Sequence, residues 1–220
     1  MTLGIRLTRW LFANAFLAGI AFICAGTVSL PIMWAYLAFF AGIGLVTLLV
    51  SSPDLAAERS QPAAGGIDPG IRPLASALLV TTVAIGALDV GRLHHSTVIH
   101  QGVRLTALGV LVVGGGLQIW AMAANPFFST ALRVQSERGH RLVTHGPYRF
   151  IRHPGYLAML LFVPGSAVAL GSTLALIPAS IYGAVILFRV SREDRFLIYN
   201  LAGYTDYICS VRYRLVPGLW

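Results

Sequence analysis

The sequence is poor in charged residues and rich in apolar ones. Only 11% of its 220 residues are charged, while 56% are hydrophobic and the mean hydropathy is +0.74. A soluble domain of this length carries about twice that charged fraction, and a disordered chain requires low hydrophobicity. The composition therefore excludes both classes. It predicts an integral membrane protein with room for about five or six spans of roughly 20 residues.

Lysine is missing, and cysteine is scarce. All 16 basic residues are arginines, so covalent catalysis by a lysine amine is excluded. The only two cysteines, Cys24 and Cys209, have no spacing typical of a metal site or a disulfide framework. A Gly-x-Gly-x-x-Gly motif after a strand is also missing, because the glycines at 42, 44 and 114–116 lie inside apolar runs, where small residues serve helix packing. We therefore predict neither a metal site nor a soluble nucleotide-binding fold.

The arginines give the chain a formal net charge of +8 and a pI of about 10.2. In a soluble protein this charge would suggest nucleic acid as a partner. Here the arginines flank apolar runs, which is typical of cytoplasmic loops and of contact with anionic lipid headgroups. We therefore expect membrane lipids as partners and no nucleic acid.

Apolar runs predict an all-α membrane bundle of about six spans. The spans are expected near residues 10–28, 32–50, 73–90, 103–124, 155–170 and 173–188. Because Gly171-Ser172 is too short for anything but a turn, the last two spans should form a tight helical hairpin. The stretch 51–72 is rich in Pro and Gly and is predicted to be a loop. We divide the chain into N-terminal transmembrane helices (1–124) and a core (125–220) with a polar loop, the hairpin and a polar tail.

The arginines also predict an orientation. With the N-terminus inside, fourteen of the sixteen arginines fall on the cytoplasmic side, and only Arg92 and Arg104 fall outside. Both termini are then cytoplasmic. The loop 125–153 and the tail 189–220 lie on the same side, so they can form one site.

The most chemically varied stretch is HRLVTHGPYRFIRHPGY, residues 140–156. Pro154 suits the first position of a helix, where free backbone N–H groups attract anions. Arg149 and Arg152 can pair with a carboxylate or a phosphate. The alternative interpretation is that these arginines anchor the helix to headgroups, although an anchor has no need of the interleaved Gly, Pro, His and Tyr.

A second stretch, SREDRFLIYNLAGYTDY (residues 191–207), carries the adjacent acids Glu193 and Asp194. Arg192 and Arg195 could simply neutralise them. Alternatively, one acid points inward and pairs with a cationic ligand. The predicted hairpin would bring Glu193 close to His153, since both lie at the cytoplasmic ends of adjacent helices.

Together these stretches resemble the isoprenylcysteine carboxyl methyltransferase family, part of a wider group of membrane methyltransferases that includes phospholipid N-methyltransferases. The resemblance rests on GPYRFIRHPGY, a helical hairpin, an acidic pair and the tail motif Tyr-x-x-x-x-Arg-x-Arg-Leu-x-Pro-Gly, and it covers residues 140–220 most strongly. Asp194 departs from the family pattern, where Glu is usual, so Glu193 is preferred as the functional acid. The resemblance to bacterial members implies a location in a bacterial inner membrane.

The resemblance implies a methyltransferase that uses S-adenosylmethionine (SAM) bound at the cytoplasmic face. It implies Arg152 and Glu193 as the catalytic residues. The implied cofactor-binding residues are His140, Val143, Gly146, Tyr148, His153, Pro154, Tyr156 and Glu193.

The chemistry of these side chains is compatible with SAM. Glu193 can hold the ammonium group, helix-start N–H groups or an arginine can hold the carboxylate, and Tyr148 or Tyr156 can pack on the adenine or the sulfonium. Methyl transfer depends mostly on orientation and electrostatics. A carboxylate acceptor, such as that of an isoprenylcysteine, needs no base and could be held by Arg152. An amine or thiol acceptor, as in phospholipid or small-molecule methylation, needs Glu193 or a histidine as the base.

Other hypotheses remain open at this point. A small transporter would place ionisable residues inside the spans, and a haem or quinone protein would need facing histidines within the bundle. Asp89, near the end of the third span, is expected to pair with Arg92 three residues later, and a functional role for this intramembrane acid is the alternative. The stretch 125–128 is interpreted as interface packing, with a part in the substrate path as the alternative.

Overall fold

The computed structural model describes residues 2–60, 62, 66–96 and 99–220. Within these residues the secondary structure is helical and contains no strand. The predicted all-α class is therefore confirmed.

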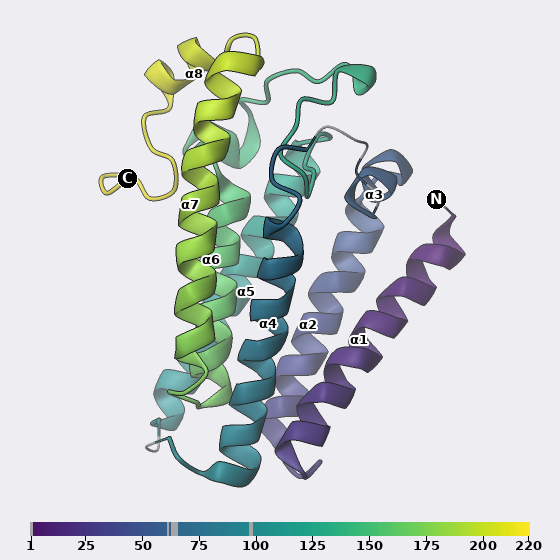
Figure 1. Cartoon of the computed structure of the whole chain (residues 1–220), viewed down its shortest axis with the longest axis vertical. Coiled ribbons are helices and arrows are strands. Elements are labelled where there is room, and N and C mark those ends of the chain that lie inside the picture. Colours follow the sequence, from purple (N-terminus) through teal and green to yellow (C-terminus); the bar gives the residue numbers. More distant parts are fainter. Residues whose placement is uncertain (1, 61, 63–65, 97–98) are drawn as a thin grey trace.

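Helices of 17 residues or more form an elongated bundle in the described part of the chain (Figure 1). They are α1 (Leu3–Ala25), α2 (Pro31–Val50), α4 (Ile71–Leu88), α5 (Gln101–Ala124), α6 (Pro154–Leu170) and α7 (Leu176–Asn200). Each corresponds to one predicted apolar segment. The largest difference is at α7, which continues about three turns past the predicted end of its span and so carries the acidic pair on a helix.

Four of the described helices are long and apolar enough to cross a membrane. They are α1, α2, α4 with its continuation to Leu93, and α5. Helix α6 is apolar but has only 17 residues, and the last third of α7 is charged. The structure thus shows an apolar bundle with four candidate spans, whereas about six were expected from the sequence.

Helices α6 and α7 form the predicted hairpin. Helix α6 ends at Gly171, whose φ of 89° is the left-handed conformation that glycine adopts readily. The chain then returns within a few residues, and the two helices pack through buried apolar side chains such as Val163, Ala167 and Ile186. The start of α6 and the end of α7 therefore lie at the same end of the bundle (Figure 1).

The stretch 51–72 is not the continuous loop that its composition suggested. It contains a short helix, α3 (Pro53–Ser60), which begins where the Ser52 hydroxyl accepts a hydrogen bond from the backbone N–H of Leu55. Asp54 in the first turn suits the positive end of the helix dipole. The Leu55 side chain is buried. Capping and burial thus outweigh the Pro-rich composition here.

At the end of the bundle opposite α3, Asp89 and Arg92 do not pair as expected but contact other groups. Residues 89–93 form a π-helical turn (Asp89–Leu93) that sends the two side chains in different directions. Asp89 accepts hydrogen bonds from the backbone N–H groups of His95 and Ser96 and from the hydroxyls of Ser96 and Ser172. Arg92 instead donates to the carbonyl of Ile23 on α1.

The polar segments gather at the α3 end of the bundle, as Figure 1 shows. There the loop 125–153 lies near α8 (Tyr204–Ser210) and carries two short 3₁₀ turns, Ser136–Arg138 and Gly146–Arg149. The loop and the tail predicted to share one side of the bundle therefore do so.

Candidate active site at the polar end of the bundle

A cavity of about 370 Å³ opens at this end, between α4, the loop after α5, the start of α6, α7 and α8. This volume lies in the usual range for small-molecule sites. One part of the wall carries Glu193, His153 and Asn125, and another carries apolar side chains such as Leu79, Met159 and Ile186. A ligand with a charged head and an apolar body would match this division.

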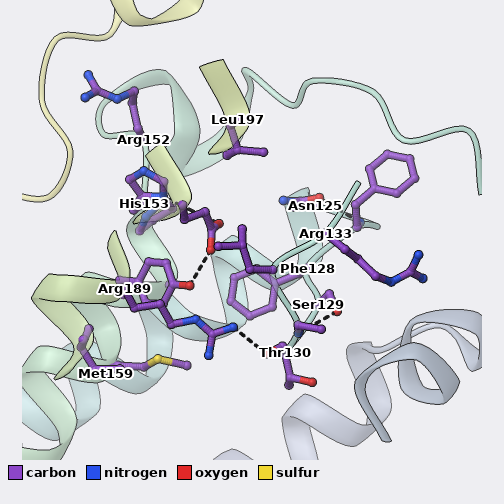
Figure 2. Close-up of a pocket in the computed structure, with 18 of the residues that line it drawn as sticks. Asn125, Phe128, Ser129, Thr130, Arg133, Arg152, His153, Met159, Arg189 and Leu197 are labelled. Carbon is purple, nitrogen blue, oxygen red and sulfur yellow. Dashed lines mark hydrogen bonds and ion pairs between the residues drawn. The ribbon is translucent and has the colours of Figure 1, made fainter. Parts of the chain in front are cut away.

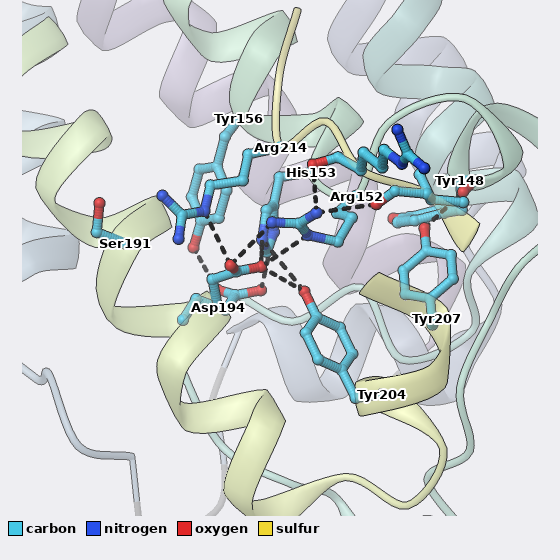
Figure 3. Close-up of polar contacts among 12 residues, drawn as sticks. Tyr148, Arg152, His153, Tyr156, Ser191, Asp194, Tyr204, Tyr207 and Arg214 are labelled. Atoms are coloured by element: carbon cyan, nitrogen blue, oxygen red, sulfur yellow. Dashed lines mark hydrogen bonds and ion pairs between the residues drawn. The ribbon is translucent and has the colours of Figure 1, made fainter. Parts of the chain in front are cut away.

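Asp194 is the centre of the polar network beside the cavity, and its side chain is only 2% exposed. Arg152 donates to both carboxylate oxygens, from Nε at 2.9 Å and from Nη2 at 3.0 Å. Tyr204 Oη donates at 2.8 Å, and His153 Nε2 lies 3.1 Å away. The Nε of Arg214, from the tail, donates at 2.8 Å. Figure 3 shows these side chains converging on Asp194 from the residues just before α6, from α8 and from the tail.

The network fixes the charge state of Asp194. Burial by itself would raise the pKa of this carboxyl, but the hydrogen bonds from His153, Arg152 and Tyr204 outweigh burial and leave the pKa well below its ordinary value. Burial and the neighbouring carboxylate also raise the pKa of Tyr204. Asp194 is therefore a stable anion, and Tyr204 stays a hydrogen-bond donor.

Arg152 connects the start of α6 to the tail. Its Nη1 donates to the carbonyls of Val211 and Arg212 at 2.8 and 2.7 Å. Its backbone N–H and that of His153 bond to the carbonyls of Tyr213 and Arg214. Most of the guanidinium N–H groups are thus committed to holding the site together.

Glu193 differs from its neighbour Asp194 because it faces the cavity. Its side chain is 25% exposed, its Oε1 lies 3.9 Å from His153 Nδ1, and its Oε2 accepts a 2.5 Å hydrogen bond from Tyr156 Oη. The hairpin therefore brings His153 and Glu193 together, as the sequence predicted. The neutralisation of both acids by Arg192 and Arg195 is not observed, because Asp194 pairs with Arg152 and Arg214 instead.

Most of the predicted site residues lie in the cavity wall. These are His140, Val143, Tyr148, Arg152, His153, Pro154, Tyr156 and Glu193. Gly146 lies outside the described wall. Its φ of 62° is a left-handed conformation that favours glycine. A Cβ added there would also lie only 2.9 Å from the Ala124 Cβ, so this turn requires glycine. The turn places Tyr148, whose hydroxyl accepts from the Asn125 side chain at 3.3 Å.

His140 is held as a neutral ring in the wall. It stacks on Phe127 with 4.5 Å between ring centroids, and its Nδ1 accepts from the backbone N–H of Gln135 at 3.1 Å. Burial, together with the charges of Arg138 and Arg133, lowers its pKa. The flat, neutral surface of His140 and Phe127 suits an uncharged aromatic group. The stretch 125–128 thus lines the cavity, in addition to packing at the end of α5.

Arg189 is a wall residue that sequence reasoning missed. It is buried on α7, and its Nη2 donates to the Thr130 carbonyl at 2.7 Å (Figure 2). Its Nε lies 3.2 Å from Asp68 Oδ2, but among the described residues neither atom has a hydrogen-bond partner. The signal was present in the sequence, because residues four apart on a helix share a face, so Arg189 lies on the face of Glu193.

The fold and this site define a helical membrane protein with an ion-stabilised cavity at one end of its bundle. Residues 107–199 match the model of the Isoprenylcysteine carboxyl methyltransferase (ICMT) family. The match confirms the resemblance seen in the sequence for this segment, which is less than half of the chain. The segment contains α6, the loop before it and nearly all of α7.

Curated relatives match less than half of the chain. A "Probable protein-S-isoprenylcysteine O-methyltransferase" of Oryza sativa subsp. indica is 29% identical over an alignment of 110 residues that covers 46% of this chain and 58% of that protein. The protein-S-isoprenylcysteine O-methyltransferase of Schizosaccharomyces pombe is 30% identical over 42% of this chain and 40% of its own length. The cobalt-zinc-cadmium resistance protein CzcN of Cupriavidus metallidurans is 37% identical over 35% of this chain and 36% of its own length. The chain thus spans well under two thirds of the relatives it matches.

The likeness in fold extends further than the likeness in sequence. A solved structure of the eukaryotic intramembrane Ras methyltransferase ICMT aligns with a TM-score of 0.52 at 20% identity, covering 94% of this chain and 74% of that one. The two chains therefore share a fold that includes the N-terminal helices.

Proposed function

We propose that this protein is a SAM-dependent methyltransferase of the membrane, which methylates a lipophilic or amphipathic acceptor of the isoprenylcysteine carboxylate class. The observation that carries the proposal is the placement of His153 and Glu193 3.9 Å apart in the wall of one cavity. The family segment contains both residues. Curated relatives named as O-methyltransferases match 46% and 42% of this chain.

The residues present fit SAM. The Glu193 carboxylate faces the cavity and can hold a cationic group of the cofactor. The rings of Tyr148, Tyr156 and His140 offer aromatic surfaces in the same wall for a sulfonium or an adenine. Val143 and Pro154 supply apolar contacts. We assign these residues, with His153, to the cofactor.

Bound SAM would supply an electrophilic methyl group, and the protein would supply orientation and electrostatics. Asp194, Arg152 and the tail hold the start of α6 against the end of α7, and so keep His153 and Glu193 at a fixed separation. A carboxylate acceptor attacks without losing a proton, so no general base is required. Glu193 then acts by orientation and charge.

The acceptor carboxylate is assigned to Arg189. The sequence suggested Arg152 for this role, but the N–H groups of Arg152 are largely committed to Asp194 and to tail carbonyls. Arg189 lines the cavity, and its buried Nε, although 3.2 Å from Asp68 Oδ2, makes no hydrogen bond within the described residues. Buried polar groups are rarely left unsatisfied, so a ligand carboxylate is a suitable partner. Arg152 is then a positioning residue.

An apolar acceptor chain would occupy the branch of the cavity between α4, α6 and α7. Its wall includes Leu79, Met159 and Ile186 and extends to Ser76, which is exposed on α4. Such an opening would admit a lipophilic molecule from the bilayer. Because fourteen of sixteen arginines lie in segments of the site end, we propose that this end faces the cytoplasm of a bacterial inner membrane.

The proposal is tested by calorimetry of S-adenosylhomocysteine binding to the purified protein in detergent. We expect the wild type to bind, Glu193→Gln and His153→Ala to bind at least tenfold more weakly, and Glu137→Gln to stay within twofold. Glu137 is the matched control because it is an exposed acid at the same end. No binding by the wild type would contradict the cofactor assignment.

A second arm tests the acceptor. Labelled SAM and N-acetyl-S-farnesylcysteine should give a base-labile methyl ester, and Arg189→Gln should raise the KM for this acceptor at least tenfold. Arg192→Gln, an exposed arginine on the same helix that lies over Phe188, should leave the KM unchanged. Cofactor binding without ester formation would retain the methyltransferase and reject this acceptor class.

A further inference from the structure

Helix α3 lies outside the segment that matches the ICMT family, yet it holds part of the cavity wall. Arg59 Nη1 donates to the Phe128 carbonyl at 3.1 Å, and its guanidinium lies 5.2 Å from the centre of the Phe128 ring. The Thr130 hydroxyl donates back to the Arg59 carbonyl at 3.2 Å. Two residues of α3, Glu58 and Arg59, together contact four residues of the loop segment 128–133, namely Phe128, Ser129, Thr130 and Arg133. We call this arrangement the clasp.

Glu58 forms the charged part of the clasp. Its residue is only 7% exposed, and its two carboxylate oxygens pair with one edge of the Arg133 guanidinium, at 3.0 Å to Nε and 2.7 Å to Nη2. The Ser129 hydroxyl donates to the same carboxylate at 2.8 Å. Arg133 also pairs with Glu137, whose side chain is 52% exposed. Glu58 therefore joins α3 to the loop, whereas Glu137 joins the loop to itself.

Stability alone does not account for such a pair. Desolvating two charges offsets much of their attraction, and apolar replacements of buried ion pairs are often as stable. A bidentate carboxylate–guanidinium pair does fix geometry, because both hydrogen bonds have a defined direction. The clasp is thus better suited to placing the loop than to stabilising the fold.

The loop that the clasp places touches the functional residues. All six residues 128–133 line the cavity. The Phe128 ring lies so close to Gly155, in the first turn of α6, that an added Cβ there would meet it at 2.5 Å. The Thr130 carbonyl accepts from Arg189, as Figure 2 shows. Movement of the loop would therefore change the orientation of Arg189.

We propose that the clasp is a positioning device for the reaction, in which Glu58 holds the loop so that the Thr130 carbonyl orients Arg189 toward the acceptor. This inference rests on the proposed function. It makes α3, and with it the N-terminal segment, part of the active site as well as part of the membrane anchor. The effect should fall on the acceptor more than on SAM, because His153 and Glu193 are held by Asp194, Tyr156 and the tail.

The test compares Glu58→Gln with Glu137→Gln. Each variant removes one carboxylate partner of Arg133 and leaves the other, so Arg133 stays paired and both proteins should fold. For Glu58→Gln we expect the KM for N-acetyl-S-farnesylcysteine to rise at least tenfold, with S-adenosylhomocysteine affinity within threefold of wild type. Backbone hydrogen exchange of residues 127–133 should accelerate at least tenfold. Glu137→Gln should change each quantity less than twofold.

A charge swap, Glu58→Arg with Arg133→Glu, made together with Glu137→Gln so that no second carboxylate faces position 133, restores an opposite pair across the same contact. It should recover most of the KM, whereas Glu58→Arg or Arg133→Glu alone should not. Unchanged exchange in Glu58→Gln would overturn the clasp. Two further results in Glu58→Gln would also overturn the proposal, because each would give Glu58 a structural role only. One is accelerated exchange with an unchanged KM for the acceptor, and the other is an equal loss of acceptor and cofactor binding. If the wild type does not methylate the probe, the activity arm rejects the proposed acceptor, and the exchange arm still decides whether Glu58 holds the loop.

Discussion

Two buried aspartates stand at opposite ends of the α6–α7 hairpin, and their partners differ. Asp194 is faced by two arginines, a histidine and a tyrosine. Asp89, which is fully buried, accepts from two backbone N–H groups and from serine hydroxyls within the described part of the chain. Burial of an acid is therefore no mark of function by itself. The nature of its partners, and a cavity beside it, are more informative.

The two networks do different physical work. At Asp89, neutral donors satisfy the carboxylate and join the π-helical turn to the hairpin turn at Ser172, which connects parts of the chain 83 residues apart. At Asp194, two arginines converge from just before α6 and from the tail, Tyr204 joins them from α8, and one more acid, Glu193, remains in contact with the cavity. The first network ties the fold together, whereas the second also creates an electrostatic environment that a cation such as SAM can use.

The largest effect is expected for Asp194→Asn. The change leaves buried Arg152 and partly exposed Arg214 without a carboxylate, and breaking a buried pair such as Arg152–Asp194 costs about 3 kcal/mol or more. Activity should fall at least a hundredfold, because Arg152 would no longer fix the start of α6 against the end of α7. Thermal unfolding in detergent and labelled methyl transfer measure the two effects.

The matched control for Asp194→Asn is Asp194→Glu, which keeps the charge found in the family pattern. It should recover a substantial part of both stability and activity. If Asp194→Asn unfolded at the wild-type temperature, the network in Figure 3 would not be holding the site together.

The second prediction concerns pH. The folded-state pKa of Asp194 lies well below its ordinary value, so its stabilising effect is complete above the unfolded pKa of about 3.9 and is lost only as the pH falls through the folded pKa. The stability difference between wild type and Asp194→Asn should therefore stay constant from about pH 8 to pH 5. Unfolding measured across this range checks the point. A difference that shrank between pH 8 and pH 6 would mean that another titrating group carries the effect.

Much of the fold was predictable because it depends on local signals. Apolar runs located α1, α2, α4, α5, α6 and α7, and Gly171-Ser172 was sufficient to predict the hairpin. The hairpin in turn predicted the approach of His153 to Glu193, since it leaves little freedom in how the two helix ends meet. The resemblance to a family then pointed to eight cofactor residues, seven of which line the cavity.

The remainder depended on tertiary contacts that composition does not encode. Successive side chains point about 100° apart around the axis of α7, so the orientation of this helix in the bundle decides which of the two adjacent acids faces the cavity. The sequence favoured Glu193 on family grounds and missed the central place of Asp194. The tail carbonyls that hold Arg152, and the contact between Glu58 and Arg133 75 residues apart, are equally non-local. The Asp89–Arg92 prediction failed because a π-helical turn changes the local geometry.

The smallest effect on activity is expected for Asp89→Asn, and this prediction tests the comparison most directly. The amide keeps one acceptor oxygen but places an NH₂ group against donors, which should cost about 1–2 kcal/mol of stability. Ser172→Ala removes one donor from the same network and should cost less. Both variants should bind S-adenosylhomocysteine within twofold of wild type, because the cavity lies at the other end of α6 and α7. A tenfold loss of binding without loss of stability would mean that the two ends of the hairpin are coupled, and the division between a structural aspartate and a functional one would no longer hold.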